Sequence, residues 1–279
     1  MNKRYITITL ALLSLAGYMQ NVALEIETDA DSAKNSTPLP QKVDILEKYK
    51  DKVCEDFEEI SMAVKHANET AKLLLKLSET SIDNYSPYFT QNKNKIIYSK
   101  KFGNIDLGRF HFTIPSPSKY SDVIEKLWDF DGTQKSDPKF INGHLTRVYA
   151  PFLIMMEQSN INQENSSFRK KLALAAKVKQ SNDTTVIVCP SRILNYLGEI
   201  DQKTNLIEIF EDTRSIETGI SPEGALIKLR ANIAGYVIKQ KNDSVHVTYI
   251  NSIYDDPRYT ESIYDRRNRG MTYSNLLAL

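Results

Sequence analysis

The chain has 279 residues, a formal net charge of +1, 41% hydrophobic residues and 25% charged residues. A charge this close to zero gives no strong attraction to nucleic acid, so we expect no nucleic-acid partner. Cys54 and Cys189 are the only cysteines, which excludes a scaffold built from several disulfides; one long-range bridge and two buried thiols both remain open.

Residues 1–23 have the layout of a secretory signal peptide. Lys3 and Arg4 form a short basic region, and Ile6–Leu15 is an apolar run of roughly ten residues. That run is too short to span a bilayer, and no later segment is long and apolar enough to do so. We therefore expect secretion, with an uncleaved N-terminal anchor as the alternative.

The segment that follows, residues 24–42, is acidic, rich in Ser, Thr and Asn, and without apolar periodicity. Such a composition is typical of a disordered leader. Signal cleavage fits after Ala16 or after Ala23. The remainder, from residue 43 onward, is long enough for one domain with a buried core.

The clearest predicted helix covers about Asp44–Glu79, with a break near Lys52–Asp56 as an open alternative. Apolar side chains recur there at spacings of three and four, which places them on one stripe of a helix. This stripe consists of Leu46, Tyr49, Val53, Phe57, Ile60, Val64, Ala67, Ala71 and Leu74. We expect the helix to pack on a sheet rather than to form a coiled coil.

Two β-rich runs follow the helix, Ile96–Phe102 and Ile105–Ile114, with Gly103-Asn104 as a hairpin turn between them. In the second run apolar and polar residues alternate, so one face is apolar and the other polar. A short helix is then predicted from Ser116-Pro117, where serine caps and proline fits the first turn, to a stop at Asp131-Gly132.

Further strands are predicted at Leu145–Met156, Leu172–Val178, Thr184–Cys189 and from Ala225 to Asn251, with a polar loop at Glu157–Ser167 and an ordered run at Leu206–Phe210. The last part forms a hairpin of Ala231–Gln240 and Ser244–Asn251, joined by the polar turn at Lys241-Asn242-Asp243. The order of elements predicts an α+β fold in which a curved antiparallel sheet wraps on a long helix.

No pattern in the chain names a catalytic or metal chemistry. The four histidines, His66, His111, His144 and His246, have no metal-ligand spacing. There is no glycine-rich phosphate loop, nucleophile elbow or zinc-protease helix. We therefore expect a protein that is not an enzyme and that uses neither a metal nor a cofactor.

Several motifs, taken together and in order, resemble the malaria-parasite fam-a proteins. These motifs are Asp122–Asp129, Thr146–Pro151, Asn182–Val188, Asn232–Ile238 and Val247–Ile253. The fam-a proteins are secreted multigene proteins built on a START (StAR-related lipid transfer) domain. The resemblance covers roughly residues 50–255, and it implies a START-like domain at 43–255 with a helix-grip fold: a curved antiparallel sheet around a long helix, enclosing a lipid tunnel.

The resemblance also implies a function. It indicates a secreted and exported lipid-binding and lipid-transfer protein that carries phosphatidylcholine between membranes, with transient contact to a membrane surface. The implied destination is the parasitophorous vacuole or the host red cell. The alternative is an exported host-interaction or antigenic protein that retains the START shell without lipid transfer.

Six residues are candidates for binding such a lipid. Arg147, in an apolar strand beside Val148, is the first candidate for the phosphate, and Arg109 is the second, because a buried phosphate needs a paired cation. A choline group favours an aromatic cage, for which the candidates are Tyr149, Trp128, Tyr236 and Tyr249. The alternatives are a rim arginine and ordinary core aromatics.

The chain departs from the family at two places. Lys170-Lys171 stands where aromatic residues are expected to lead into a strand. Residues 256–279 are divergent: Asp256-Pro257 and a basic cluster, Arg266-Arg267-Asn268-Arg269, leave only Met271–Leu279 for one or two helical turns. A short or missing lid helix there would leave the tunnel open.

Overall fold

The structure is a computed structural model that describes residues 45–92, 95–130, 141, 143–159, 170–196, 200–201, 203–211, 213–255 and 261–278. The predicted signal peptide (1–23), the leader (24–42), Asp131-Gly132 and Asp256-Pro257 lie outside the described residues. The chain divides into two compact units, Met1–Lys48 and Tyr49–Leu279. In the first, α2 (Ile45–Lys48) is a single turn, and all that follows concerns the second.

The long predicted helix is present, with the break that its sequence left open. A short 3-10 turn, η1 (Lys50–Lys52), precedes the 23-residue helix α3 (Phe57–Glu79). The side chain of Asp56 caps α3 by accepting hydrogen bonds from the backbone N–H groups of Glu58 and Glu59, at 2.9 and 3.1 Å. This cap satisfies two donors that an α-helix leaves without partners, and it fixes where α3 begins.

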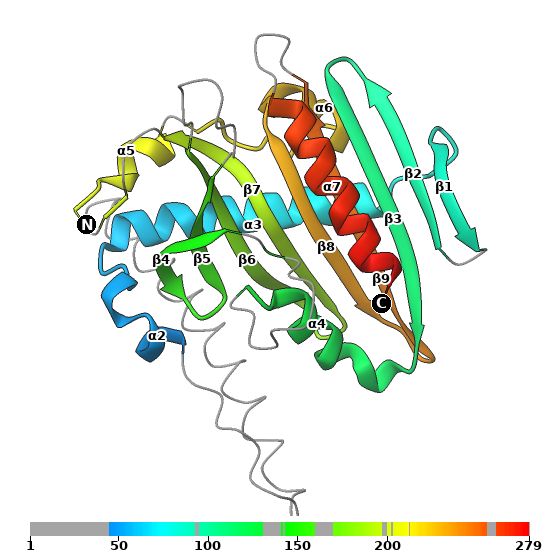
Figure 1. Cartoon of the computed structure of the whole chain (residues 1–279), viewed down its shortest axis with the longest axis horizontal. Helices are drawn as coiled ribbons and strands as arrows, with labels where there is room; N and C mark the ends of the chain where they lie inside the picture. The colour runs from blue at the N-terminus through cyan, green and yellow to red at the C-terminus, as the bar shows by residue number, and fades with distance from the viewer. Residues whose placement is uncertain are drawn as a thin grey trace, which may run out of the picture. The chain divides into compact units, whose positions relative to one another are not determined.

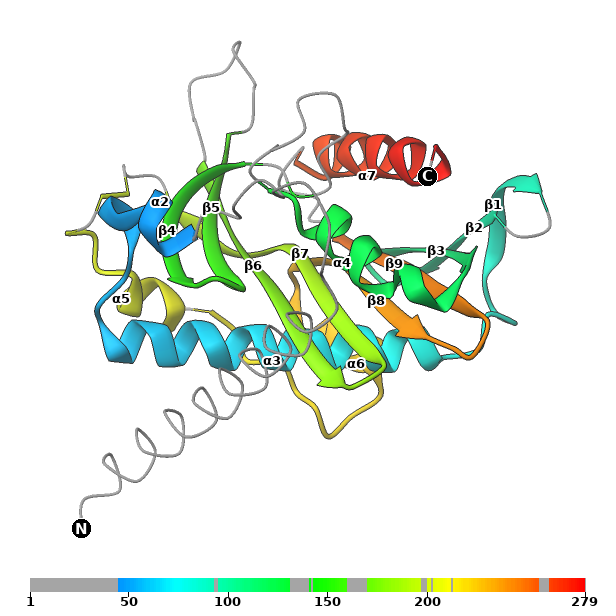
Figure 2. The same cartoon turned by 90° about the horizontal axis from the view of Figure 1, so that it is seen from below.

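Nine antiparallel strands form one sheet (Figure 1), in the order β1-β2-β3-β9-β8-β7-β6-β5-β4. The strands are β1 (Ser86–Asn92), β2 (Lys95–Phe102), β3 (Ile105–Pro115), β4 (His144–Ala150), β5 (Leu153–Ser159), β6 (Lys170–Ser181), β7 (Thr184–Tyr196), β8 (Asn232–Gln240) and β9 (Ser244–Tyr254). The sheet curves strongly at its β4–β5 end (Figure 2). The predicted α+β fold with a curved antiparallel sheet and a long helix is thus confirmed.

Both predicted hairpins are confirmed. The turn between β2 and β3 has Gly103 at a φ of +54°, a left-handed conformation that glycine adopts without the penalty of a side chain. β8 and β9 pair directly, with Tyr236 opposite Tyr249. Strand β1 carries no alternating pattern, and the sequence did not predict it.

Two local predictions were wrong. Leu145–Met156 is two strands, β4 and β5, with a turn after Ala150, where Pro151 lacks the N–H that a continuing ladder needs. Ala225, expected in a strand, lies in a helix, α6 (Pro222–Leu229); the ordered run Leu206–Phe210, predicted without a type, lies in the helix α5 (Leu206–Glu211). α6 carries the start signals of a helix, because Ser221 accepts a bond from the N–H of Gly224 and proline follows it.

The helix predicted from Ser116-Pro117 is present as η2 (Pro117–Lys119) continued by α4 (Tyr120–Trp128). The proposed serine cap is not formed. Ser116 has a φ of +122°, and its hydroxyl pairs with that of Ser118 at 2.7 Å instead of with the helix backbone.

Helices cover both faces of the sheet (Figure 2). α3, α5 and α6 lie on one face, whereas α4 and the last helix, α7 (Glu261–Leu277), lie on the other. α7 has 17 residues and is longer than the one or two turns expected, because it includes Gly270 and the basic cluster. Within the described ranges, no helix is both long and apolar enough to cross a membrane.

The α3 face is a close-packed core. Ala63, Ala71 and Leu74 of α3 are fully buried against strand residues such as Val186 and Val188. At Gly235 of β8 the helix comes so near that an added Cβ would lie 2.3 Å from Cδ1 of Leu74 and 2.5 Å from the backbone oxygen of Ile187. Glycine is therefore required at this position for α3 to reach the sheet.

Replacing Gly235 with alanine is expected to lower the free energy of unfolding by about 1–3 kcal/mol, because the backbone of β7 cannot move away as a flexible side chain can. Urea denaturation measures the change. Gly270→Ala is the matched control: no atom lies within 4 Å of its added Cβ, so alanine is expected to be neutral or stabilising in α7. Equal stabilities of wild type and Gly235→Ala would contradict the packing argument.

Candidate functional site

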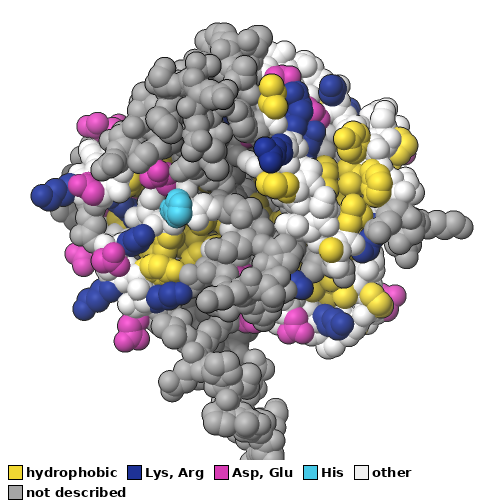
Figure 3. Space-filling model, in the orientation of Figure 1, with side chains coloured by type: hydrophobic (Ala, Val, Ile, Leu, Met, Phe, Trp, Pro, Cys, Tyr) yellow, Lys and Arg dark blue, Asp and Glu magenta, His cyan; other side chains and the backbone are white. Residues whose placement is uncertain are grey.

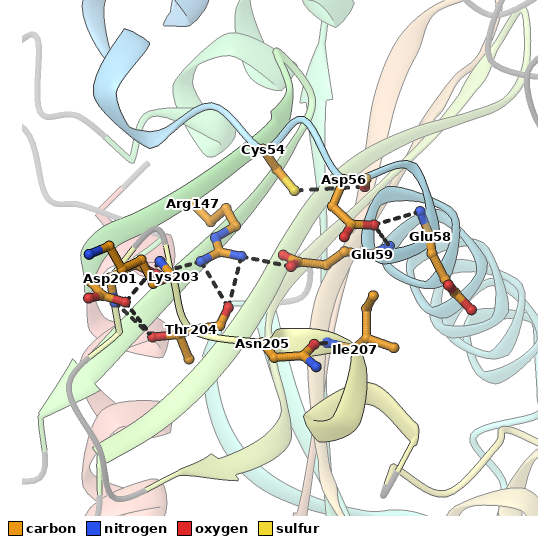
Figure 4. Close-up of polar contacts among 10 residues, drawn as sticks. All are labelled: Cys54, Asp56, Glu58, Glu59, Arg147, Asp201, Lys203, Thr204, Asn205 and Ile207. Carbon is orange, nitrogen blue, oxygen red and sulfur yellow. Dashed lines mark hydrogen bonds and ion pairs between the residues drawn. The ribbon is translucent and has the colours of Figure 1, made fainter.

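Arg147 lies in a buried ion pair with Glu59 (Figure 4). Its Nη1 is 2.7 Å from Oε2 of Glu59, so the pair joins β4 to the first turn of α3. Nη2 donates to the carbonyl oxygen of Asp201 at 2.6 Å, and both Nη atoms lie 3.4 Å from the carbonyl oxygen of Thr204. Arg147 is 6% exposed. Its guanidinium is therefore already engaged, by one carboxylate and two carbonyls.

Tyr149 and Cys54 lie in the electrostatic surroundings of this pair. Burial raises the pKa of the Tyr149 phenol well above its ordinary value, and the Glu59 carboxylate raises it further. Burial also raises the pKa of the Cys54 thiol to about 11, although a hydrogen bond to the backbone of Asp56 opposes the rise. Cys54 and Cys189 are free cysteines. A thiol that stays protonated at neutral pH is a poor nucleophile.

Arg109 binds the C-terminal end of α3. From β3, its Nη1 donates to the carbonyl oxygen of Thr80 at 2.7 Å and contacts that of Leu77 at 3.5 Å, while Nη2 donates to that of Ser78 at 2.5 Å. The last carbonyls of a helix lack backbone N–H partners within it and form the negative end of its dipole. Burial lowers the pKa of Arg109, and the tyrosine hydroxyls of Tyr85 and Tyr98 oppose this.

The other three candidates belong to the opposite face of the sheet or to α4. Tyr236 and Tyr249 lie side by side on β8 and β9, with ring centroids 4.9 Å apart, and Tyr249 makes an edge-on contact with Tyr273 of α7 at 5.7 Å. Burial raises the pKa of all three phenols. Trp128 is the last residue of α4, and its ring contacts Phe130.

The six candidates therefore do not converge. Side chains of successive strand residues point to opposite faces, and this parity places Arg147, Arg109 and Tyr149 on the α3 face, with Tyr236 and Tyr249 on the α7 face. The structure does not bring Arg147 or Arg109 together with the tyrosine pair into one headgroup site.

α7 is held on the sheet by ion pairs that the sequence did not predict. Nη2 of Arg269 is 3.0 Å from a carboxylate oxygen of Asp106 on β3, and Arg266 bridges Asp106 and Asp255 at 3.3 and 2.6 Å. Burial alone would raise the pKa of Asp106, but the bonds from Arg269 and Arg266 outweigh it and lower this pKa. Two members of the basic cluster are thus engaged with the domain, whereas Arg267 is exposed.

A second polar contact joins α7 to β6. Lys171, which is 3% exposed, lies 3.9 Å from the Asp265 carboxylate, which also accepts a hydrogen bond from Asn232 of β8. Lys171 therefore replaces the expected aromatic residue with a buried cation whose counterion comes from α7. The positions that look divergent in the sequence, Lys171 and the α7 segment, contact each other.

Between α7 and the sheet, the described residues include buried polar atoms for which no hydrogen-bond partner is found, among them Oη of Tyr273 and Oδ1 of Asn251. Both lie next to Gly108, which pairs with Asn251 across β3 and β9 and whose added Cβ would lie 2.1 Å from the Tyr273 hydroxyl. Buried polar groups are nearly always paired, so these two are positioned to bind a polar group that enters beneath α7. We name Asn251, Tyr273 and Tyr249 the seam cluster.

No arrangement of side chains in the described ranges points to catalysis or to a metal site. No group of three or more His, Cys, Asp or Glu side chains there could hold a metal ion. His66, buried on α3, stacks on Phe210 at 5.5 Å, and burial lowers its pKa. The seam cluster is therefore one place among the described residues where hydrogen-bonding capacity is unmet beneath a helix.

No family model matches the chain, and no curated protein matches it. Among solved structures, human StAR-related lipid transfer protein 5 is 10% identical with a TM-score of 0.44, over 77% of this chain and 95% of that one. Human STARD10 is 11% identical with a TM-score of 0.39, over 74% and 78% of the two chains. The STAR-related lipid transfer protein of Xanthomonas axonopodis is 12% identical with a TM-score of 0.37, over 62% and 83%. Identities and TM-scores this low carry no argument about function, so a function can be argued only from the residues of this chain.

Proposed function

We propose that this protein binds a phospholipid between α7 and the sheet and transfers it between membranes, without covalent chemistry. The observation that carries the proposal is the seam cluster, with its two buried and unpartnered polar atoms beneath a helix held by ion pairs. The phosphate or ester oxygens of a lipid headgroup accept a hydrogen bond from the Tyr273 hydroxyl, while Oδ1 of Asn251, itself an acceptor, faces the positively charged part of the headgroup. Apolar residues of the same face, such as Phe110 and Tyr236, provide the surroundings for acyl chains.

The energetics favour a lipid over a small polar ligand at this position. Each acyl CH₂ that leaves water contributes about 0.8 kcal/mol. A headgroup placed in an apolar interior costs several kcal/mol unless its polar atoms are bonded. The Tyr273 hydroxyl is the donor for a headgroup oxygen, and the Asn251 oxygen attracts the positive charge of the headgroup. The adjacent rings of Tyr236 and Tyr249 favour a quaternary ammonium through cation–π attraction. We therefore propose phosphatidylcholine as the lipid.

We further propose that the protein is secreted and exported, to the parasitophorous vacuole or the host red cell. The signal-peptide pattern of residues 1–23 and the resemblance of the sequence to the fam-a proteins support this. Contact with a membrane surface is supported by the outward side of α7, where Ile263 and Met271 are 62% and 50% exposed beside the exposed Arg267. Figure 3 shows hydrophobic and basic side chains next to each other in the upper part of this face, where α7 begins.

Replacing Tyr273 with phenylalanine is expected to leave the fold intact and to weaken the retention of phosphatidylcholine about fivefold. The substitution removes one hydroxyl that makes no hydrogen bond within the described protein, while a hydrogen bond to a headgroup contributes about 1 kcal/mol. The measurement is transfer of labelled phosphatidylcholine from donor to acceptor vesicles by the mature chain from Leu24, with thermal unfolding of both proteins as the control.

Transfer by wild type with retention reduced in Tyr273→Phe supports the carrier and its seam cluster. Equal retention by the two proteins would reject the seam cluster as the headgroup site. A folded wild-type protein that transfers no phosphatidylcholine would reject the carrier, and would favour an exported interaction protein that retains the shell.

A further inference from the structure

A groove opens on the α3 face, where the sheet extends past the C-terminal end of the helix. Figures 1 and 2 show β1, β2 and β3 reaching beyond the end of α3. The groove has a volume of about 680 Å³, and its lining includes Ile82, Ile96, Tyr98, Arg109, His111 and Thr113. Sites for small molecules typically have volumes of roughly 300–1,000 Å³. The sheet separates this groove from the seam cluster, so it does not belong to the proposed lipid site.

Among the described residues that line the groove, Arg109 is the one with a charged side chain. Three other well-buried cations in the described part of the chain face carboxylates: Arg147 faces Glu59, Lys171 faces Asp265, and Arg269 faces Asp106. Among the described residues, Arg109 instead bonds carbonyl oxygens and the Tyr85 hydroxyl, and no carboxylate. Its full positive charge therefore faces neutral hydroxyls and the partial negative charge of a helix end, which amounts to about half an elementary charge. The groove is thus electrostatically suited to an anion.

The hydrogen-bonding capacity of Arg109 leads to the same conclusion. A guanidinium carries five N–H donors; the carbonyls of Leu77, Ser78 and Thr80 engage at most three of them, and the Tyr85 hydroxyl takes a fourth. At least one donor remains for a carboxylate oxygen, in a charge-assisted pair. Such a pair would leave the cap on α3 undisturbed.

The remaining walls of the groove are neutral and partly apolar. Nδ1 of His111 lies 3.0 Å from the Thr248 hydroxyl, and burial, assisted by the nearby His246 and Arg109, lowers the pKa of His111 to about 4. The imidazole is therefore uncharged at neutral pH and adds no competing charge. Ile82, Ile96 and the ring of Tyr98 provide apolar surface for the body of a ligand.

We infer that this groove is a second binding site, independent of the proposed lipid site, for a small organic acid with one carboxylate and an apolar body. The carboxylate pairs with Arg109, and the apolar body lies along Ile82, Ile96 and Tyr98. The site is open to solvent on the α3 face, so a ligand enters it without displacement of α7.

The test is calorimetric titration of the folded protein with decanoate, with decanol as the matched uncharged probe. Arg109→Gln removes the charge but also loosens the end of α3, so Thr113→Trp is the main variant: it fills the groove from an exposed position. We expect decanoate binding to wild type, at least tenfold weaker binding to Thr113→Trp, and unchanged binding to Tyr273→Phe. In NMR titrations, the anion bound beside Arg109 should also raise the pKa of His111.

Absence of decanoate binding to wild type would overturn the inference. Equal binding by wild type and Thr113→Trp would do so as well, since the anion would then bind elsewhere. Decanol binding as tight as decanoate binding would reject the role of Arg109. None of these outcomes depends on phospholipid transfer. The titrations therefore test the groove site independently of the transfer assay, which tests the lipid carrier.

Discussion

Replacing Glu59 with leucine is expected to destabilise the protein by about 3–5 kcal/mol, because it leaves the buried guanidinium of Arg147 without its carboxylate. The two carbonyls that also bind Arg147 are neutral and cannot offset the cost of desolvating a full charge. A loss of this size is a large fraction of the stability of an ordinary domain, which is about 5–15 kcal/mol. Urea denaturation followed by fluorescence and by circular dichroism gives the free energy of unfolding.

The double variant Glu59→Leu with Arg147→Met is the control for this prediction. It removes both charges and keeps similar volumes, so it is expected to recover most of the lost stability. The exposed pair of Glu79 and Lys239 supplies the second control, since Glu79→Ala should change the stability by less than about 1 kcal/mol. A Glu59→Leu protein as stable as wild type would show that the pair contributes nothing.

Replacing Gly108 with alanine is expected to loosen α7 without unfolding the sheet. The new Cβ would lie 2.1 Å from the Tyr273 hydroxyl and 3.2 Å from Cδ of Arg269, so the Tyr273 ring must move from its place between α7 and β3 and Arg269 must shift slightly. Overpacking of this kind costs about 1–3 kcal/mol, which corresponds to roughly a 5- to 150-fold rise in local opening. Hydrogen exchange of the backbone amides at residues 261–277 measures it directly.

A second substitution separates the steric cause from other effects of the alanine. Tyr273→Phe removes the hydroxyl that the new Cβ would strike, so Gly108→Ala with Tyr273→Phe should regain much of the protection of α7. The amides of β7 and β8, far from this contact, serve as the internal reference. Faster exchange throughout the sheet in Gly108→Ala would indicate global destabilisation and reject the local explanation.

Much of the fold was predictable because its signals are local. The helical spacing of apolar residues in α3, the glycine turn between β2 and β3, and the alternation in β3 each lie within a short window of sequence. The predicted stripe was wrong at Phe57, which is 67% exposed. The segments that were misread or left without a type are those in which the local signal is ambiguous: a short apolar run such as Leu206–Phe210 fits a strand and a helix equally well. The contact of this segment with α3 favours the helix, and that contact cannot be predicted from the residues of the segment alone.

The candidate site was less predictable for a different reason. Arg147 was rightly marked as unusual in an apolar strand, but its carboxylate partner is 88 positions away. Asp106 and Arg269 are 163 positions apart, and Lys171 and Asp265 are also distant in sequence. Pairing between charges on remote elements depends on the register of the sheet and the docking of α7. Sequence patterns mark such residues as exceptional without naming their partners.

The position of β9 beside β3 affects how the protein acquires its fold. β3 ends at Pro115, yet its sheet partner β9 begins only at Ser244. While the chain is being synthesised, the edge of β3 that pairs with β9 therefore stays unpaired until nearly all of the remaining chain has emerged. Such dependence on distant contacts slows folding and exposes strand edges to other chains. A ribosome-bound or translocating chain that stops short of Tyr254 is thus an aggregation-prone intermediate rather than a partly finished domain.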